Sequence, residues 1–298
     1  MRYRPFSHTG MAISALSLAL HGEGDERSAN DWRDLIHAAF EEGVNAFEFI
    51  HPSPALLKGF AMGAASVQRR LLFIALRIDE ADDAAHLADA VGEVISEAGL
   101  GDLDLISVNA DPSRQSGIPA AMRLLKDQGR VRSLGVAGES DLLTDHVRNG
   151  AFDALITSFN ILSGWRERHL IRTAVEQQMA VIGCDPHPPE VDPLAEAAHA
   201  QARPGWFAKR NPLASAGSYA FLSATPGWSA EQLCLGYALT EPSLATVQVS
   251  VFDPPHLTSL AEITERDLPA AASAQIEMAR FSAERASGAE RRSERRSA

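Results

Sequence analysis

Short runs of apolar residues alternate along the chain with longer stretches in which apolar residues recur every three or four positions. A short, continuous apolar run is typical of a strand that is covered on both faces, as in a parallel sheet. Seven runs have this character, and Ala15–His21 is expected to precede them as a first strand. The seven are Val44–Phe49, Leu71–Ile78, Leu103–Val108, Val131–Val136, Ala154–Ser158, Ala180–Cys184 and Thr246–Val251.

The stretches between these runs have the spacing of amphipathic helices. Asp31–Glu42 places Trp32, Leu35 and Ile36 on one face. The same logic predicts helices over Ala84–Ala98, Ile118–Gln128, Arg166–Gln178 and Ser229–Thr240. Strands that alternate with helices predict a (β/α)₈ barrel. A doubly wound sheet has the same periodicity, but no G-x-G-x-x-G motif follows an early strand, which disfavours it.

Two segments interrupt this rhythm. Asp185–Gly227 is rich in proline and follows Ala180–Cys184, the seventh predicted strand when Ala15–His21 is counted as the first, so a long loop is expected at the catalytic rim. The last residues, 284–298, contain mainly Arg, Glu, Ser and Ala and are predicted to be a disordered tail. Residues 1–283 are therefore expected to form a single barrel domain.

Composition narrows the classes of function. The chain has 298 residues, 45% of them hydrophobic, which is enough for a large core. Its net charge of −12 argues against a general nucleic-acid surface, and no apolar stretch is long enough to predict a membrane span. The two cysteines, Cys184 and Cys234, form neither a metal-binding spacing nor a disulfide framework, so a reducing cytoplasm is expected.

Several segments are similar to one known family. The opening MRYRPFSHTGMAISALSLAL, the run EGVNAF at 42–47, the run GDLDL at 101–105 and above all KDQGRVRSLGV at 126–136 resemble the aldo-keto reductases. The resemblance implies a barrel closed at its bottom by a short N-terminal β-hairpin. It also implies an ancestry of carbonyl reduction by hydride transfer from NAD(P)H, although function must still be argued from the site.

The resemblance implies four positions for the catalytic Asp, Tyr, Lys and His, and each holds another residue here. The position implied for Asp holds Glu48, that for Tyr holds Ser53, that for Lys holds Arg77 and that for His holds Asn109. Ser53 is shorter and far less acidic than a phenol, Arg77 stays protonated, and Asn109 cannot titrate. Since general acid catalysis is worth ~10²–10⁴ in rate, carbonyl reduction by the family mechanism is not expected. Glu48 and Arg77 are predicted to form a buried structural pair.

The cofactor positions that the resemblance implies have changed as well. Ile156 falls where a glutamine would hold the nicotinamide carboxamide, and Cys184 where an aromatic ring would stack on it. Ala137–Ser140 replaces a Ser-Asn pair. Asp253 lies where a basic phosphate loop is expected, and its carboxylate would repel a phosphate. No bound cofactor is therefore predicted.

Three functions remain open. The first is a catalytically degenerate barrel whose mouth binds a small molecule or a protein partner. The second is a divergent oxidoreductase that binds NADP(H) and uses His51 as a substitute proton donor. The third is a metal-dependent lyase or hydrolase, although the candidate ligands have no recognised spacing. These ligands are Glu48, His51, Asp111, Asp185 and His187. Structural roles are favoured for His187, Cys184 and three tryptophans near the rim, Trp165, Trp206 and Trp228.

Overall fold

Eight parallel strands close into a barrel in a computed structural model that describes residues 1–78, 84–109, 118–138, 140–192, 219–251 and 253–282. The order around the barrel is β10-β3-β4-β5-β6-β7-β8-β9, so sequence neighbours are also spatial neighbours. The strands are β3 Leu16–His21, β4 Ala46–Ile50, β5 Phe73–Ile78, β6 Leu103–Asn109, β7 Val131–Ala137, β8 Ala154–Ser158, β9 Ala180–Cys184 and β10 Thr246–Val249. The predicted (β/α)₈ barrel is confirmed.

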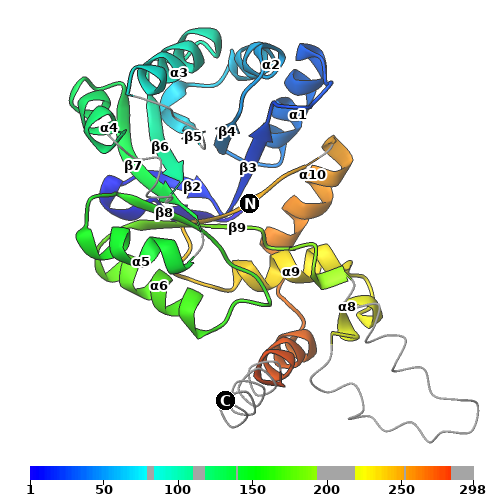
Figure 1. Cartoon of the computed structure of the whole chain (residues 1–298). Coiled ribbons are helices and arrows are strands. Elements are labelled where there is room, and N and C mark those ends of the chain that lie inside the picture. Colours follow the sequence, from blue (N-terminus) through cyan, green and yellow to red (C-terminus); the bar gives the residue numbers. More distant parts are fainter. Residues whose placement is uncertain (79–83, 110–117, 139, 193–218, 252, 283–298) are drawn as a thin grey trace, which may run out of the picture.

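Helices surround the strands and cover their outer faces (Figure 1). They are α1 Ala29–Glu41, α2 Pro54–Ala64, α3 Ala84–Glu97, α4 Ile118–Asp127, α5 Ser140–Asn149, α6 Trp165–Glu176, α8 Phe221–Ala224, α9 Ala230–Leu239 and α10 Pro254–Ala261. A further helix covers residues 270–282. Ser28 and Ser229 begin α1 and α9 with capping boxes, which explains why these helices start where they do.

The predicted N-terminal hairpin closes the bottom of the barrel. Strand β1 (Tyr3–Pro5) pairs antiparallel with β2 (Ala12–Ser14). Phe6 and Ile13 from this hairpin are buried among the small and branched residues that fill the barrel interior. The ring centroids of Phe6 and Phe73 lie 4.5 Å apart. The interior is therefore a packed core at this end, as in other barrels of this architecture.

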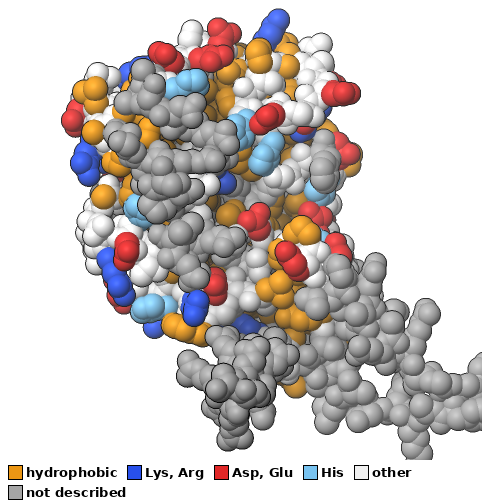
Figure 2. All heavy atoms as spheres, in the orientation of Figure 1, with side chains coloured by type: hydrophobic (Ala, Val, Ile, Leu, Met, Phe, Trp, Pro, Cys, Tyr) orange, Lys and Arg blue, Asp and Glu red, His pale blue; other side chains and the backbone are white. Residues whose placement is uncertain are grey.

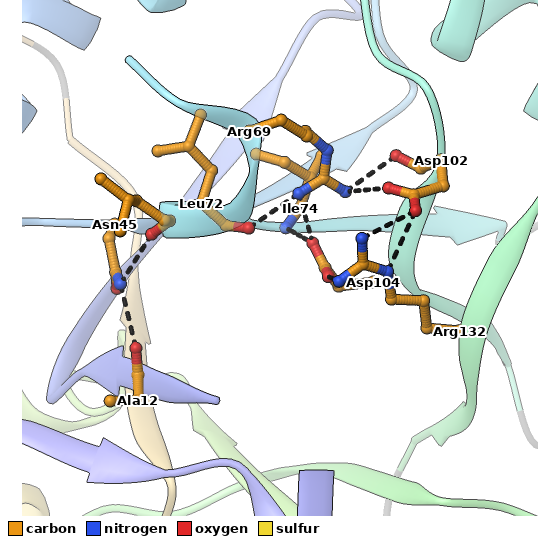
Figure 3. Close-up of polar contacts among 9 residues, drawn as sticks. Ala12, Asn45, Arg69, Leu72, Ile74, Asp102, Asp104 and Arg132 are labelled. Carbon is orange, nitrogen blue, oxygen red and sulfur yellow. Dashed lines mark hydrogen bonds and ion pairs between the residues drawn. The ribbon is translucent and has the colours of Figure 1, made fainter. Parts of the chain in front are cut away.

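Ion pairs hold the N-terminal ends of β5, β6 and β7 together (Figure 3). Asp104 is 3% exposed and accepts hydrogen bonds from the backbone N–H of Ile74 at 2.9 Å and from Arg69 at 2.8 Å. Arg132 contacts Asp104 at 3.3 Å and Asp102 at 2.8 Å. Burial raises the pKa of Asp104, and the Arg69 charge opposes that rise. These side chains belong to the stabilising end of the barrel rather than to its mouth.

Five helices were not predicted from the sequence: α2, α5, α8, α10 and the helix over residues 270–282. Helix α8 lies within the segment predicted as a long loop, and most of that segment, like the predicted tail from residue 284, is outside the described residues. Among the helices of the described ranges, none combines the length and hydrophobicity required to cross a bilayer. The predicted domain boundary at residue 283 remains a prediction.

Candidate functional site

The barrel mouth holds a buried polar network at the carboxyl ends of four strands. Glu48 on β4 is 2% exposed. Its Oε2 accepts hydrogen bonds from Nη2 of Arg77 at 2.6 Å and from Nε2 of Gln248 at 2.7 Å. Its Oε1 accepts from Oγ of Ser107 and from Nε of Arg77, at 3.2 and 3.3 Å. Arg77 also donates to Oε1 of Gln248 at 3.1 Å.

This network confirms the predicted pair of Glu48 and Arg77 and adds two members that the sequence analysis missed. Four donor contacts engage both carboxylate oxygens, so the buried charge is well compensated. Ser107 and Gln248 could have been found, because each is a buried polar residue between two apolar neighbours on its strand. Their shared partner was not apparent from the sequence.

Ser53, at the position implied for the tyrosine, is the N-cap of α2. Its side chain accepts a hydrogen bond from the backbone N–H of Leu56 at 3.3 Å, and Pro54 occupies the first helical turn. Serine before proline is a common start of a helix, because the serine oxygen satisfies an exposed donor and proline has none to lose. The Ser-Pro pair therefore has a structural reason that the sequence analysis did not identify.

Replacing Ser53 by Ala should lower the free energy of unfolding by about 1 kcal/mol, the usual effect of losing an N-cap oxygen. Urea denaturation would measure it. Ser53→Asp should keep the cap, and Ser229→Ala should have a similar effect at α9. Unchanged stability in Ser53→Ala would show that the cap contributes nothing.

His51 follows β4 and lies at the rim of a cavity of about 460 Å³ between α2 and α3. The cavity is also lined by Glu23, Ser53 and Arg77 and by apolar residues of α2 and α3. The side chain of His51 is 42% exposed, and its Nδ1 lies 3.9 Å from Glu23. His51 has a positive φ of 43°, an uncommon conformation for a residue with a Cβ. The structure thus brings three of the predicted site residues to one cavity.

A second cavity of about 230 Å³, the central cavity, lies at the carboxyl ends of β3, β4, β5, β9 and β10. Arg77 lines both cavities, and Gln248, Cys184 and Glu231 line the central one. Asn109, the position implied for the histidine, is exposed at the end of β6 and lines neither cavity.

Cys184 ends β9, with its sulfur 3.9 Å from the Ser158 hydroxyl. Part of the residue reaches the central cavity, yet burial raises the pKa of its thiol to about 12, with a further rise from Asp185. Burial also raises the pKa of Cys234 to about 12. A thiol of this kind is a poor nucleophile, which agrees with the predicted structural role.

Both cysteines should resist thiol reagents in the folded protein. With a pKa about four units above the working pH, only about one thiol in ten thousand is ionised near pH 8. Labelling with a chromogenic disulfide should be slow until denaturant is added, and both thiols should then react. Rapid labelling of native Cys184, with Cys184→Ala as the control, would identify a reactive thiol instead.

The residues at the implied cofactor positions do not fit a dinucleotide. Ile156 is buried in the barrel interior, where its side chain has no group to hydrogen-bond a carboxamide. Asp253 is the N-cap of α10 and accepts from the backbone N–H of His256 at 2.9 Å. A carboxylate thus occupies the helix N-terminus that would otherwise attract a phosphate. Gly138 follows β7, and Glu139 lies outside the described residues.

The candidate metal ligands that the structure describes have other polar partners, and Asp185 and His187 line the same cavity as Arg77. His187 pairs with Asp192 at 3.1 Å, which agrees with its predicted role in anchoring a loop, and Asp185 accepts from Ser158 at 2.8 Å. Asp111 lies outside the described residues. Within the described ranges, no group of three or more histidine, cysteine or carboxylate side chains is placed to hold a metal ion.

The three tryptophans near the rim have different environments. Trp228 is half-buried, with the Arg266 guanidinium 4.1 Å from its ring centroid, as a packing role requires. Trp206 is outside the described residues. Trp165 is 66% exposed, so the packing role predicted for it is wrong.

Comparison with known proteins extends this description. No family model matches the chain, and no curated protein matches it. The aldo-keto reductase AKR11C1 from Bacillus halodurans, in its holo form, has 15% identity and a TM-score of 0.70, over 93% of this chain and 95% of that one. PA4992 from Pseudomonas aeruginosa, a protein assigned to the aldo-keto reductases, has 18% identity and a TM-score of 0.63, over 88% of this chain and 94% of that one. This chain therefore has the fold of the aldo-keto reductases.

Proposed function

We propose that this chain is a catalytically degenerate, aldo-keto-reductase-like protein whose barrel mouth binds a small molecule or a protein partner. One observation supports this most directly. Arg77 and Glu48, at the positions implied for the lysine and aspartate, form a largely buried hydrogen-bond network with Ser107 and Gln248. The network contains no tyrosine, lysine or histidine side chain, so it lacks the groups that the family mechanism uses to transfer a proton.

The surrounding residues support the same proposal. Carbonyl reduction needs a proton donor with a pKa near the working pH, and an aliphatic hydroxyl such as Ser53 is far from that range. The Ser53 oxygen also caps α2. The positions implied for the cofactor present an isoleucine, a buried thiol and a helix-capping carboxylate.

Calorimetric titration of the full chain with NADPH and with NADH would test this proposal. We expect no saturation up to about 1 mM, because the site lacks stacking, carboxamide and phosphate contacts. No consumption of NADPH is expected with an aryl aldehyde as substrate. Micromolar binding of either dinucleotide together with carbonyl turnover would refute the proposal.

A divergent oxidoreductase is the second candidate, because His51 shares a cavity with Arg77 and Ser53 and lies beside Glu23. In that case His51 would replace the missing donor. If turnover is found, His51→Asn should remove it and its dependence on pH, whereas His86→Asn in the same cavity should not. Equal turnover in both variants would exclude His51 as the donor.

The cytoplasmic location predicted from the sequence is part of this proposal. The two cysteines are both free, which is compatible with a reducing compartment.

A further inference from the structure

Trp165 is the most exposed of the large hydrophobic residues in the described part of the chain, with 66% of its surface accessible. It is the first residue of α6, directly after the N-cap Gly164. An indole at this position adds little to the helix, whose first turn is satisfied by the Glu167 carboxylate accepting from the Gly164 N–H at 2.8 Å. The Arg166 guanidinium lies 5.8 Å from the centroid of the indole, so an aromatic ring and a cation are presented together on this surface.

The indole stands over a groove of about 310 Å³ between α5 and α6. Arg148 of α5 and Arg166 and His169 of α6 line it, together with Thr144, Leu170 and Thr173. Among these described lining residues none carries a carboxylate. At the lower left, Figure 2 shows arginine or lysine and histidine side chains over these two helices, with acidic side chains among them.

The charge of this α5–α6 groove is opposite to that of the whole chain. The net charge is −12, yet the groove presents two guanidinium groups and an imidazole beside an exposed indole. Such a site attracts carboxylates, and the effect is local because salt screens more distant charges within about 10 Å. Tryptophan and arginine are also the side chains most enriched among residues that dominate binding energy at protein interfaces.

We propose that the α5–α6 groove docks an acidic segment of a partner protein. An aromatic or large aliphatic side chain of that segment packs on Trp165, and its carboxylates pair with Arg148 and His169. The docking surface lies on the flank of the barrel and uses none of the residues at the mouth. It goes beyond the proposed function and does not depend on whether the mouth binds a ligand.

Fluorescence anisotropy with the full chain and a short fluorescein-labelled peptide of glutamates around a single phenylalanine tests this proposal. Trp165→Ala and Arg148→Glu should each weaken binding of the peptide about tenfold. The first removes the apolar contact with phenylalanine, and the second replaces the cation that pairs with a glutamate by an anion. Arg148→Gln should have an intermediate effect, since it removes the charge without reversing it. Binding should weaken as salt is raised.

Leu124→Ala and Arg123→Glu on α4 are matched controls, since both side chains are exposed on another helix. They should change the affinity by less than about twofold. A peptide with glycine in place of phenylalanine should bind more weakly, and one with lysines in place of glutamates should not bind. Equal affinity in the groove variants and the wild type, preference for the lysine peptide, or no saturation at about 1 mM would overturn the proposal.

Discussion

Replacing Arg77 by methionine is expected to lower the free energy of unfolding by about 3–5 kcal/mol, as for other buried ion pairs that lose one partner. Methionine keeps much of the side-chain volume but leaves the Glu48 carboxylate, which is 2% exposed, without its counter-charge. Ser107 and Gln248 would remain as donors but carry no charge. Urea denaturation monitored by circular dichroism would measure the loss.

Two variants separate the buried charge from the volume of the side chain. Glu48→Gln combined with Arg77→Met removes both charges and should recover most of the lost stability. Arg33→Met breaks the pair that Arg33 forms with Asp34 at 2.7 Å on the surface, and should cost less than about 1 kcal/mol. If Arg77→Met is as stable as the wild type, the network at the mouth does not stabilise the barrel.

Asp104 lies at the opposite end of the barrel. Replacing it by alanine is also expected to lower the free energy of unfolding by about 3–5 kcal/mol. The change leaves the N–H of Ile74 without its acceptor and removes the carboxylate that Arg69 and Arg132 both contact (Figure 3). Asp102 remains bonded to both arginines and limits the loss. Thermal and urea denaturation would measure it.

Asp104→Asn is the matched control, because its amide oxygen can still accept from Ile74 while the charge is absent. Its loss should be smaller than that of Asp104→Ala. Neither variant should alter peptide binding at the α5–α6 groove, provided that both are assayed where they are folded. A loss in Asp104→Asn as large as in Asp104→Ala would show that the charge matters more than the hydrogen bond.

The segments that resemble the aldo-keto reductases lie mainly at the bottom of the barrel, where the network of Figure 3 is found. The run GDLDL contributes Asp102 and Asp104, and KDQGRVRSLGV contributes Arg132. The replaced positions, in contrast, lie at the mouth or close to it. Because residues at the bottom maintain the barrel and residues at the mouth carry the chemistry, a chain can keep the first while losing the second.

The sequence predicted the barrel because burial leaves a clear pattern. Strands covered on both faces must be almost wholly apolar, and the helices around them need only one apolar stripe. The predicted limits of the strands differ from those in the structure by about two residues. The strand predicted at Val44–Phe49, for example, covers Ala46–Ile50. Helix α2 was missed because the Ser53-Pro54 pair was interpreted as the remains of a catalytic site rather than as a cap.

The sequence predicted the pair of Glu48 and Arg77 through the family positions that the resemblance implies, and the structure places the two side chains 2.6 Å apart on neighbouring strands. Only the tertiary structure decided that Gln248, two hundred positions away, completes the network. Closure of the barrel pairs β10 with β3, which itself pairs with β4, so residues from the two ends of the chain meet across the mouth. Periodicity shows which face of a strand a residue occupies, but not which residue lies opposite it.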